Sequence, residues 1–345
     1  MIILSLIRVY LSIRIMSGNT YNITFLMRNR LSGFSIHKVF RPVIAQFDNA
    51  AVIEAPRHRA TPISILYNLI WIRNHVKGNG VIHMTGGPHY FLLALKGKRN
   101  ILTIHDLVLL HNSTGLKHAI YKQLWFQLPI RYAKAVTCIS ETVAKDLSTN
   151  FTMPKEKIHI IYNAVDTNFR YTEKAFNSNN PRILHVGTTW NKNLERVIKA
   201  LIGVPCTLVI IGAIDKHIQT ILETNNIIYI QKQNISDAML RKEYELADIV
   251  SFPSIYEGFG MPIVEGQAVG RPVLTSNIAP MTEIANGGAC LVDPTDETSI
   301  KNGFLKIIQD ETFRQQLIRA GKENIKRFSV EKITKQYKDL YTSLL

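Results

Sequence analysis

The amino-acid sequence predicts an α/β protein with two Rossmann-like domains. The chain has 345 residues, of which 46% are hydrophobic, so it can bury a large core and its length favours two domains. Short β-branched segments alternate with helical patterns along most of this length, which is typical of parallel sheets covered by helices on both faces. A polar stretch at residues 172–181 separates two such series and is interpreted as a linker. We therefore expect domains at residues 1–171 and 181–328.

The first series predicts four strands and two helices that cover the sheet. The strands are expected at residues 21–27, 81–84, 100–104 and 135–139, and amphipathic patterns predict the helices at residues 64–76 and 118–134. The second series predicts strands at residues 182–186, 207–211, 227–230, 249–252 and 272–275. Neither series contains a Gly-x-Gly-x-x-Gly fingerprint, so a nicotinamide- or flavin-dependent dehydrogenase is disfavoured.

Positive charge is concentrated in the first predicted domain. Residues 1–170 hold 21 Lys and Arg against 7 Asp and Glu, a net charge of +14, whereas residues 171–345 hold 20 against 19. A basic domain of this kind suits an anionic membrane surface, a polyanionic acceptor or nucleic acid. Nucleic acid is disfavoured, because no recognition motif accompanies the basic residues and aromatic residues do not interleave with them.

The cysteines and the first residues bear on the cellular compartment. The three cysteines lie far apart in apolar segments without metal or redox spacing, which indicates buried thiols in a reducing cytosol: Cys138, Cys206 and Cys290. The first fifteen residues are apolar, but they contain Arg8 and Arg14, are too short to span a bilayer and lack a signal-peptide pattern. A cytoplasmic protein is therefore expected, in which this segment is either a surface-lying anchor or precedes a true start at Met16.

Residues 249–275 are the most informative segment. The buried strand at residues 249–252 is followed by a glycine-flanked loop, residues 257–260, at the strand end where open α/β sheets bind ligands. A helix is expected next, with Pro262 suited to its first turn and Gly270 to its exit. The amides at the start of this helix form an anion site suited to a diphosphate or to sugar hydroxyls.

Two carboxylates belong to this segment. Glu257 lies in the loop and Glu265 lies one turn into the expected helix, so the two would flank one ligand at different depths. Carboxylates bind pairs of hydroxyl groups well. Taken alone, the segment is also consistent with two solvated glutamates at an ordinary strand-to-helix turn.

The same segment resembles the motif of glycosyltransferase family 4, in which a Glu-Gly-Phe-Gly loop and a second glutamate eight residues later form the nucleotide-sugar site. The residues in register are Tyr256, Glu257, Gly258, Phe259, Gly260, Met261, Pro262 and Glu265, followed by the Gly-Arg-Pro-Val sequence at residues 270–273 and by Ser276 and Asn277. Further elements of the family pattern occur in the same order at residues 104–107, 139–141, 161–166, 186–194 and 292–294, so the resemblance covers about residues 100–330.

One departure concerns the phosphate loop at residues 186–194. Many members have an arginine there, whereas this chain has Thr188 and Asn191. Lys192 would then be the main cation for the donor phosphates, aided by Asn193 and the amides of the following helix. The departure bears on donor affinity rather than on the type of reaction.

The resemblance implies a GT-B fold, in which an N-terminal acceptor domain faces a C-terminal nucleotide-sugar domain across a cleft and residues 329–345 form a helix that packs back toward the N-terminal domain. It also implies transfer with retention of configuration, without a metal or other cofactor, and the chain contains no Asp-x-Asp motif. Glu265 would hold the ribose, Glu257 the donor sugar, and His105 the donor sugar or the acceptor. The residues expected to act in catalysis are His105, Lys192 and Glu257, and those expected to bind the donor are Gly187, Thr188, Lys192, Asn193, Glu257, Gly258, Phe259, Gly260, Met261, Pro262 and Glu265.

The leading functional hypothesis is sugar transfer to a lipid-linked glycan of a bacterial surface polysaccharide, such as lipopolysaccharide, at the inner face of the plasma membrane. The candidate membrane contacts of the N-terminal domain are Arg57, Arg59, Lys117, Lys122, Arg131 and Lys134. A solvated basic face without a partner remains the alternative for this surface. A non-catalytic nucleotide-sugar-binding subunit of the same fold remains the alternative for the whole chain.

Overall fold

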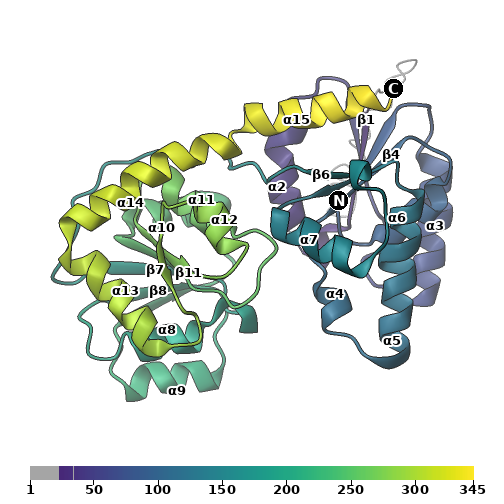
Figure 1. Cartoon of the computed structure of the whole chain (residues 1–345). Coiled ribbons are helices and arrows are strands. Elements are labelled where there is room, and N and C mark those ends of the chain that lie inside the picture. Colours follow the sequence, from purple (N-terminus) through teal and green to yellow (C-terminus); the bar gives the residue numbers. More distant parts are fainter. Residues whose placement is uncertain (1–22, 34) are drawn as a thin grey trace, which may run out of the picture.

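A computed structural model describes residues 23–33 and 35–345. The expectations about the first fifteen residues, about Met16 and about the start of the first strand at Tyr21 lie outside the described residues. The structure confirms the predicted α/β class and its two domains, since each domain has a six-stranded sheet whose recorded strand pairs are all parallel (Figure 1).

The N-terminal sheet has the strand order β2-β1-β3-β4-β5-β6. Its strands are β1 (Ile23–Met27), β2 (Ala50–Glu54), β3 (Val81–Met84), β4 (Asn100–Ile104), β5 (Ala135–Cys138) and β6 (Ile158–Ile160). Its helices are α2 (Ser35–Ile44), α3 (Pro62–His75), α4 (Val108–His111), α5 (Gly115–Ile120), α6 (Leu128–Tyr132) and α7 (Glu141–Asn150), with a π-helical turn at Tyr121–Gln127 and 3₁₀ turns at Arg30–Ser32, His89–Leu95 and Lys155–Lys157. Every residue of β3, β4 and β5 is buried, because helices cover both faces of these central strands.

The C-terminal sheet has the strand order β12-β11-β10-β7-β8-β9. Its strands are β7 (Arg182–Val186), β8 (Thr207–Ile211), β9 (Tyr229–Lys232), β10 (Ile249–Phe252), β11 (Val273–Ser276) and β12 (Cys290–Val292). Its helices are α8 (Leu194–Ala200), α9 (Lys216–Thr224), α10 (Asp237–Leu246), α11 (Met261–Ala268), α12 (Met281–Ala285), α13 (Glu297–Gln309) and α14 (Glu311–Asn324), with 3₁₀ turns at Trp190–Lys192 and Ile325–Phe328. The three cysteines are buried free thiols, as expected.

The last helix, α15 (Val330–Ser343), leaves the C-terminal domain and packs on the N-terminal one, where Figure 1 shows it lying over α2. Its buried residues Ile333, Tyr337 and Tyr341 share a core with Phe25 and Phe40. The Tyr341 hydroxyl lies 2.6 Å from Nδ1 of His83, whose Nε2 lies 2.7 Å from the Thr103 hydroxyl. This buried chain of hydrogen bonds fixes α15 to two central strands.

The chain crosses between the domains twice, and the two crossings are joined. The first crossing precedes the predicted linker, and the second lies between the turn at Ile325–Phe328 and α15. The Val165 N–H donates to the Phe328 carbonyl over 2.9 Å. The two segments therefore run together where the chain passes from one domain to the other.

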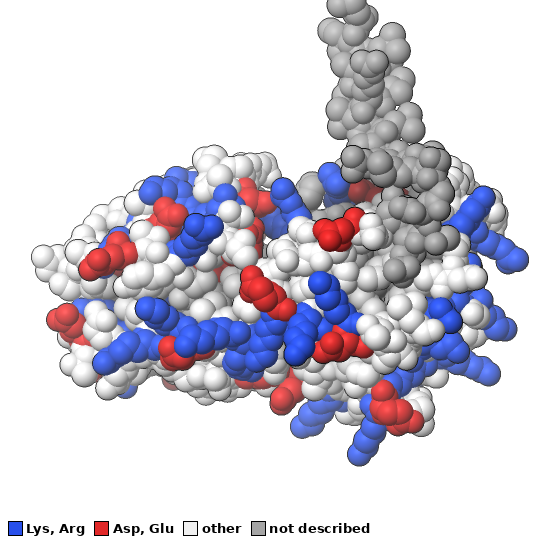
Figure 2. All heavy atoms as spheres, turned by 90° about the horizontal axis from the view of Figure 1, so that it is seen from above, with Lys and Arg blue, Asp and Glu red and all other residues white. Residues whose placement is uncertain are grey.

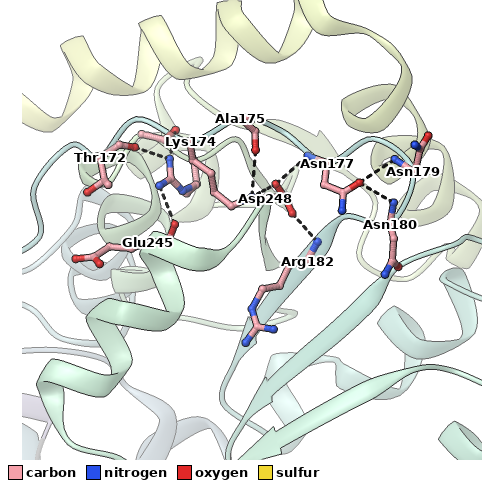
Figure 3. A network of polar contacts seen from close by, with 11 residues as sticks. Thr172, Lys174, Ala175, Asn177, Asn179, Asn180, Arg182, Glu245 and Asp248 are labelled. Atoms are coloured by element: carbon pink, nitrogen blue, oxygen red, sulfur yellow. Dashed lines mark hydrogen bonds and ion pairs between the residues drawn. The ribbon is translucent and has the colours of Figure 1, made fainter.

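The polar stretch at residues 172–181 is held on the C-terminal domain (Figure 3). The buried carboxylate of Asp248 pairs with Lys174 and accepts the N–H groups of Asn177 and Arg182 over 3.1 and 2.8 Å. The Arg271 guanidinium donates to the Thr172 carbonyl over 2.8 Å and to the Glu245 carbonyl over 2.9 Å. The stretch predicted as a linker is thus an extended segment fastened to the domain that follows it.

Three sequence predictions about local structure were wrong in part. Strands β2, β6 and β12 were not predicted, and β9 begins two residues later than expected. Residues 118–134 do not form one regular helix, because Pro129 has no N–H for the Trp125 carbonyl. His89 instead donates to this carbonyl over 2.8 Å, and a π-helical turn precedes Pro129. Helix α3 covers the domain as predicted but is not simply amphipathic, since it exposes apolar residues and buries Ser64 and Asn68.

Candidate active site

Two loops of the C-terminal domain meet at the carboxyl ends of neighbouring strands. β7 is the first strand of its sheet; β8 and β9 follow on one side of it, whereas β10, β11 and β12 follow on the other. The chain therefore continues in opposite directions along the sheet after β7 and after β10. Ligands of open α/β sheets bind at the carboxyl ends of the strands where the strand order reverses in this way. These loops, residues 187–193 and 253–260, contain most of the candidate residues.

The loop after β10 and the start of α11 have the predicted geometry. Gly260 and Gly270 have φ angles of 111° and 77°, in the left-handed region that favours glycine, and Pro262 lies in the first turn of α11. The positive end of the α11 dipole thus lies at the carboxyl edge of the sheet, where Pro262 has no N–H and the Ile263 N–H donates to the Gly260 carbonyl over 3.0 Å. This local geometry suits a ligand with negative charge.

Lys192 and Glu257 lie in direct contact. The Lys192 Nζ is 2.6 Å from the Glu257 Oε1, and both side chains are mostly buried, with exposed fractions of 20% and 13%. The Asn191 side-chain amide donates to the same carboxylate oxygen and to the Tyr256 carbonyl, each over 3.0 Å. Asn191 therefore holds Glu257 and its loop in place.

The other residues of the β7 loop support Lys192. Gly187 has a φ angle of 94°, and a Cβ atom there would lie 3.0 Å from the Lys192 Cγ, so the glycine leaves room for the lysine stem. Thr188 packs against Gly212 in the neighbouring loop. Asn193 is buried, and its side-chain amide donates to the Pro253 and Pro294 carbonyls over 3.0 and 2.7 Å. The Asn193 side chain thus connects three loops, while its backbone N–H donates to the Trp190 carbonyl over 3.4 Å.

Phe259 faces the interior rather than a ligand. Its side chain is 3% exposed and contacts the rings of Tyr162 and Phe328, with ring centroids 6.2 and 5.6 Å away. These two partners lie in or beside the two interdomain crossings. Among the expected donor-binding residues, Phe259 therefore has a packing role for its side chain, and only its backbone is available to a donor.

Glu265 lies one turn into α11 and is partly buried. The Tyr244 hydroxyl donates to the Glu265 Oε2 over 2.6 Å. Burial raises the pKa of the Glu265 carboxyl to about 7, an effect that the Tyr244 hydrogen bond and the nearby Lys38 oppose. Burial also raises the pKa of Tyr244 far above its usual value, so the tyrosine keeps its proton and remains a donor.

His105 follows β4 in the N-terminal domain and reaches the interdomain face. Its Nε2 donates to the Thr85 carbonyl over 2.8 Å. Burial lowers the pKa of His105, so the ring is neutral and Nδ1 is its acceptor atom. A Cβ atom on Gly86, whose φ angle is 121°, would lie 2.4 Å from the ring. Gly86 is thus needed to seat His105.

The two domains touch through this same region. A Cβ atom on Gly258 would lie 1.9 Å from the His105 carbonyl oxygen, so only glycine permits this approach. The Ser140 hydroxyl donates to the Gly258 carbonyl over 2.8 Å, and the Glu141 N–H donates to the Glu283 carboxylate over 2.8 Å. The structure therefore brings His105 beside the β10 loop, whose Glu257 contacts Lys192 of the β7 loop, although these residues are far apart in the sequence.

Two further groups at this face could not be identified from the sequence. Arg28, after β1, is partly buried, and burial lowers its pKa while Asp106 opposes the effect. Its side chain packs against Gly87. Tyr244 lies on α10, outside any motif recognised in the sequence. Among residues 23–33 and 35–345, no cluster of three or more His, Cys, Asp or Glu residues could hold a metal ion.

Two family models match adjacent parts of the chain. The model described as Glycosyltransferase Family 4 matches residues 38–169, and the model described as Glycosyl transferases group 1 matches residues 168–324. The first model falls on the N-terminal domain, and the second covers the loops after β7 and β10.

Individual proteins are similar over much of the chain. The uncharacterized glycosyltransferase MJ1178 of Methanocaldococcus jannaschii is 28% identical over 262 residues, which cover 71% of this chain and 70% of that protein. The O-antigen chain mannosyltransferase RfbU of Salmonella typhimurium is 25% identical over 222 residues, 61% of this chain and 62% of RfbU. The crystal structure of Anabaena Alr3699/HepE in complex with UDP and glucose superimposes with a TM-score of 0.73 at 16% identity, covering 94% of this chain and 100% of that one. This last likeness shows a shared fold.

Proposed function

The chain belongs to the group 1 and family 4 glycosyltransferases of the GT-B fold, and from this premise we propose that it transfers a sugar from a nucleotide diphosphate sugar to a glycan acceptor of a bacterial surface polysaccharide. The observation that carries the proposal is the contact of Lys192 with Glu257 where the loops after β7 and β10 meet. Relatives named for O-antigen synthesis support the class of product.

The donor would separate the Lys192–Glu257 pair. The diphosphate offers Lys192 a partner of higher negative charge, and the sugar hydroxyls donate to the carboxylate of Glu257 once the lysine turns away. Asn191 keeps Glu257 in position during this exchange, because its amide contacts the same oxygen and the Tyr256 carbonyl. In the absence of a donor, the ion pair thus holds both side chains in the site, and each charge is compensated by the other.

The nucleoside would lie along α11, with its ribose at Glu265. Tyr244 donates to one carboxylate oxygen of Glu265, which leaves the other for the ribose hydroxyls. HepE, whose structures hold UDP and UDP-glucose, supports a nucleotide-sugar donor for a chain of this fold. The base and the sugar of the donor are the variables that a ligand screen must determine.

Breaking the sugar–phosphate bond requires stabilisation of the departing diphosphate. In the proposed reaction Lys192, the amides at the start of α11 and those near Asn193 supply it without a metal ion. His105, neutral and seated by Gly86, contacts the donor sugar or the acceptor. We propose retention of anomeric configuration, with attack on the donor face that the phosphate leaves and with a phosphate oxygen as base.

The proposed acceptor is lipid-linked, and the proposed location is the cytoplasmic face of the plasma membrane. The N-terminal domain, which would receive the acceptor, carries nearly all of the chain's excess positive charge. Anionic lipids attract such a surface. Among the described residues, no helix is both long and apolar enough to cross a bilayer.

A screen of nucleotide sugars by thermal shift tests the donor proposal, because a ligand that binds only the folded state raises its melting temperature. Transfer is then measured by mass spectrometry of a lipid-linked acceptor, with hydrolysis of the donor as a second readout. We expect a shift with one class of nucleotide sugar and turnover with the same donor. A shift without hydrolysis or transfer to any acceptor would instead indicate a non-catalytic binding subunit.

A further inference from the structure

Helix α3 carries apolar side chains on its solvent face. Ile63, Leu66, Tyr67 and Ile70 are 75%, 60%, 44% and 54% exposed. Their spacing of three, four and seven residues places them on one side of the helix. We call these four residues the α3 stripe. No other described element covers it, although apolar residues at helical spacing are usually the ones that face a core.

The opposite side of α3 explains why the stripe faces outward. Ser64, Asn68 and Ile72 are buried there. The Asn68 side chain accepts the Arg57 N–H and donates to the Arg57 carbonyl and to the Tyr90 hydroxyl, over 3.1, 3.0 and 3.3 Å. These bonds fix the rotation of the helix about its axis. The stripe is therefore presented by a helix held in one orientation, and its exposure does not result from a loosely packed element.

Positive charge frames the stripe at both ends. Residues 55–105 contain seven Lys and Arg and no Asp or Glu. Arg57 and Arg59 precede α3, and the Arg57 guanidinium lies 4.4 Å from the centre of the Tyr67 ring. At the other end, Arg73 and Lys77 are exposed. Figure 2 shows Lys and Arg side chains projecting along the outer edge of the N-terminal domain, with few acidic groups among them.

A hollow continues this frame beyond the end of α3. Its polar rim includes Arg73, Lys77, Lys96 and Lys98, and its apolar wall includes Val76 and Leu93. Lys98 donates to the Gly78 carbonyl over 3.0 Å, which keeps its ammonium group at this rim. Four cations around a partly apolar depression are suited to the phosphate of a lipid headgroup.

We infer that α3 is the membrane-contacting element of this protein, with the α3 stripe at the acyl boundary of an anionic leaflet and the cations at both ends on the lipid phosphates. An apolar helical face flanked by Lys and Arg is the pattern of helices that lie in the plane of a membrane interface. A protein partner would have to be both apolar and strongly acidic to match this surface. The inference rests on the proposed membrane-bound acceptor and specifies the surface that faces it.

The inference differs from the contacts expected from charge alone. Arg57 and Arg59 remain in the proposed surface. The other four expected contacts do not belong to the cations named above at the two ends of α3, and they are predicted to contribute less to membrane binding: Lys117, Lys122, Arg131 and Lys134. The reason is that interfacial binding scales with buried apolar area as well as with charge, and the α3 stripe supplies that area.

The test is cosedimentation of the full chain with vesicles of phosphatidylglycerol and phosphatidylcholine, without a nucleotide sugar. The stripe variant combines Ile63→Gln, Leu66→Gln and Ile70→Gln, which replace exposed residues with a good helix former. We expect its partition constant to fall on the order of 100-fold, because each of the three side chains contributes about fivefold when its exposed part is buried. The charge variant, Arg73→Gln with Lys77→Gln, should fall about 20- to 30-fold, or about fivefold per cation.

The matched control replaces three exposed apolar residues of the C-terminal domain: Ile228→Gln, Met239→Gln and Leu291→Gln. This control should bind vesicles like the wild type, and all variants should keep the far-ultraviolet circular dichroism and melting temperature of the wild type. Wild-type affinity in the stripe variant would overturn the inference, as would equal binding of the wild type to purely neutral vesicles.

Self-association is measured in parallel by analytical ultracentrifugation. A dimer that the stripe variant abolishes, together with no vesicle binding by the wild type, would identify a second copy of the chain as the occupant and overturn the membrane inference. Donor hydrolysis by the same samples is a separate readout. A loss of vesicle binding with unchanged hydrolysis supports the inference, whereas an absence of hydrolysis in every sample would contradict the proposed function and leave the vesicle result interpretable.

Discussion

Glu265→Gln should stabilise the ligand-free protein and do so more strongly at alkaline pH. The Glu265 carboxyl is partly buried, accepts a hydrogen bond from Tyr244 and has its pKa raised to about 7 by burial. Glutamine has nearly the same shape and keeps an oxygen that accepts the Tyr244 hydroxyl, but it cannot ionise. The substitution therefore removes the cost of burying a charge without opening a cavity.

The size and sign of the effect follow from the pKa. A rise from the ordinary value of 4.5 to about 7 corresponds to a cost of at most about 3 kcal/mol for the ionised form. Between these two values the folded protein binds more protons at this site than the unfolded chain, so the contribution of Glu265 to the free energy of unfolding falls as pH rises and levels off above about pH 7. Glu265→Gln should consequently gain up to about 3 kcal/mol at about pH 8.5, and this gain should shrink toward zero near pH 4.5.

The assay is urea unfolding followed by circular dichroism at pH 5.5 and pH 8.5. The matched control is Glu173→Gln, which changes an exposed glutamate in the stretch at residues 172–181. This control should leave the urea midpoint of unfolding unchanged at both pH values. The reasoning is refuted if Glu265→Gln unfolds at a lower urea concentration than the wild type at pH 8.5, or if its gain is the same at both pH values.

Three other perturbations probe the reaction. Lys192→Ala should slow sugar transfer by about 100- to 1,000-fold, since it removes a fixed charge from a developing anion; a rate close to the wild type would assign this role to another group. Transfer should survive dialysis against EDTA, and turnover that is lost and then restored by magnesium or manganese would contradict a metal-free reaction. Gly258→Ala should slow transfer and increase the radius of gyration in small-angle scattering, because its Cβ atom would collide with the His105 carbonyl that it lies against when the domains touch. An unchanged radius and rate would show that this contact is dispensable.

The central strands were predictable from the sequence and the edge strands were not. The strands β3, β4, β7, β8 and β10 have the predicted bounds, because strands covered on both faces are continuous apolar segments. The missed strands β2, β6 and β12 and the displaced strand β9 are the four sheet edges. An edge strand has one neighbour and is partly exposed, so its sequence is mixed and carries little periodicity.

The candidate site could be predicted where backbone geometry dictates the residue. Gly260 and Pro262 follow from the needs of a strand-to-helix turn, whereas the roles of Glu257 in the β10 loop and of Glu265 in α11 were implied by the family resemblance and stay predictions. Two features could not be predicted, because both depend on segments distant in sequence. One is the burial of Phe259 between the domains, and the other is the pair of hydrogen bonds by which the Asn193 side chain connects neighbouring loops. The same holds for the solvent face of α3, because the rotation of that helix depends on the Asn68 hydrogen bonds.

The paired crossings limit how the domains can separate. The first crossing is fastened to the C-terminal domain from Thr172 onward by Arg271 and Asp248, and the second is bonded to the first between Val165 and Phe328. Phe169 also packs on the Tyr244 ring and the Tyr171 ring lies against Gly270, so the backbone torsions left to change on opening are confined to short stretches near residues 166–168 and 328–330. Two adjacent hinge segments permit rotation of one domain about the axis that passes through both, and they resist rotation about other axes. A donor would then enter from the side opposite the crossings, where the Glu257 loop and His105 part.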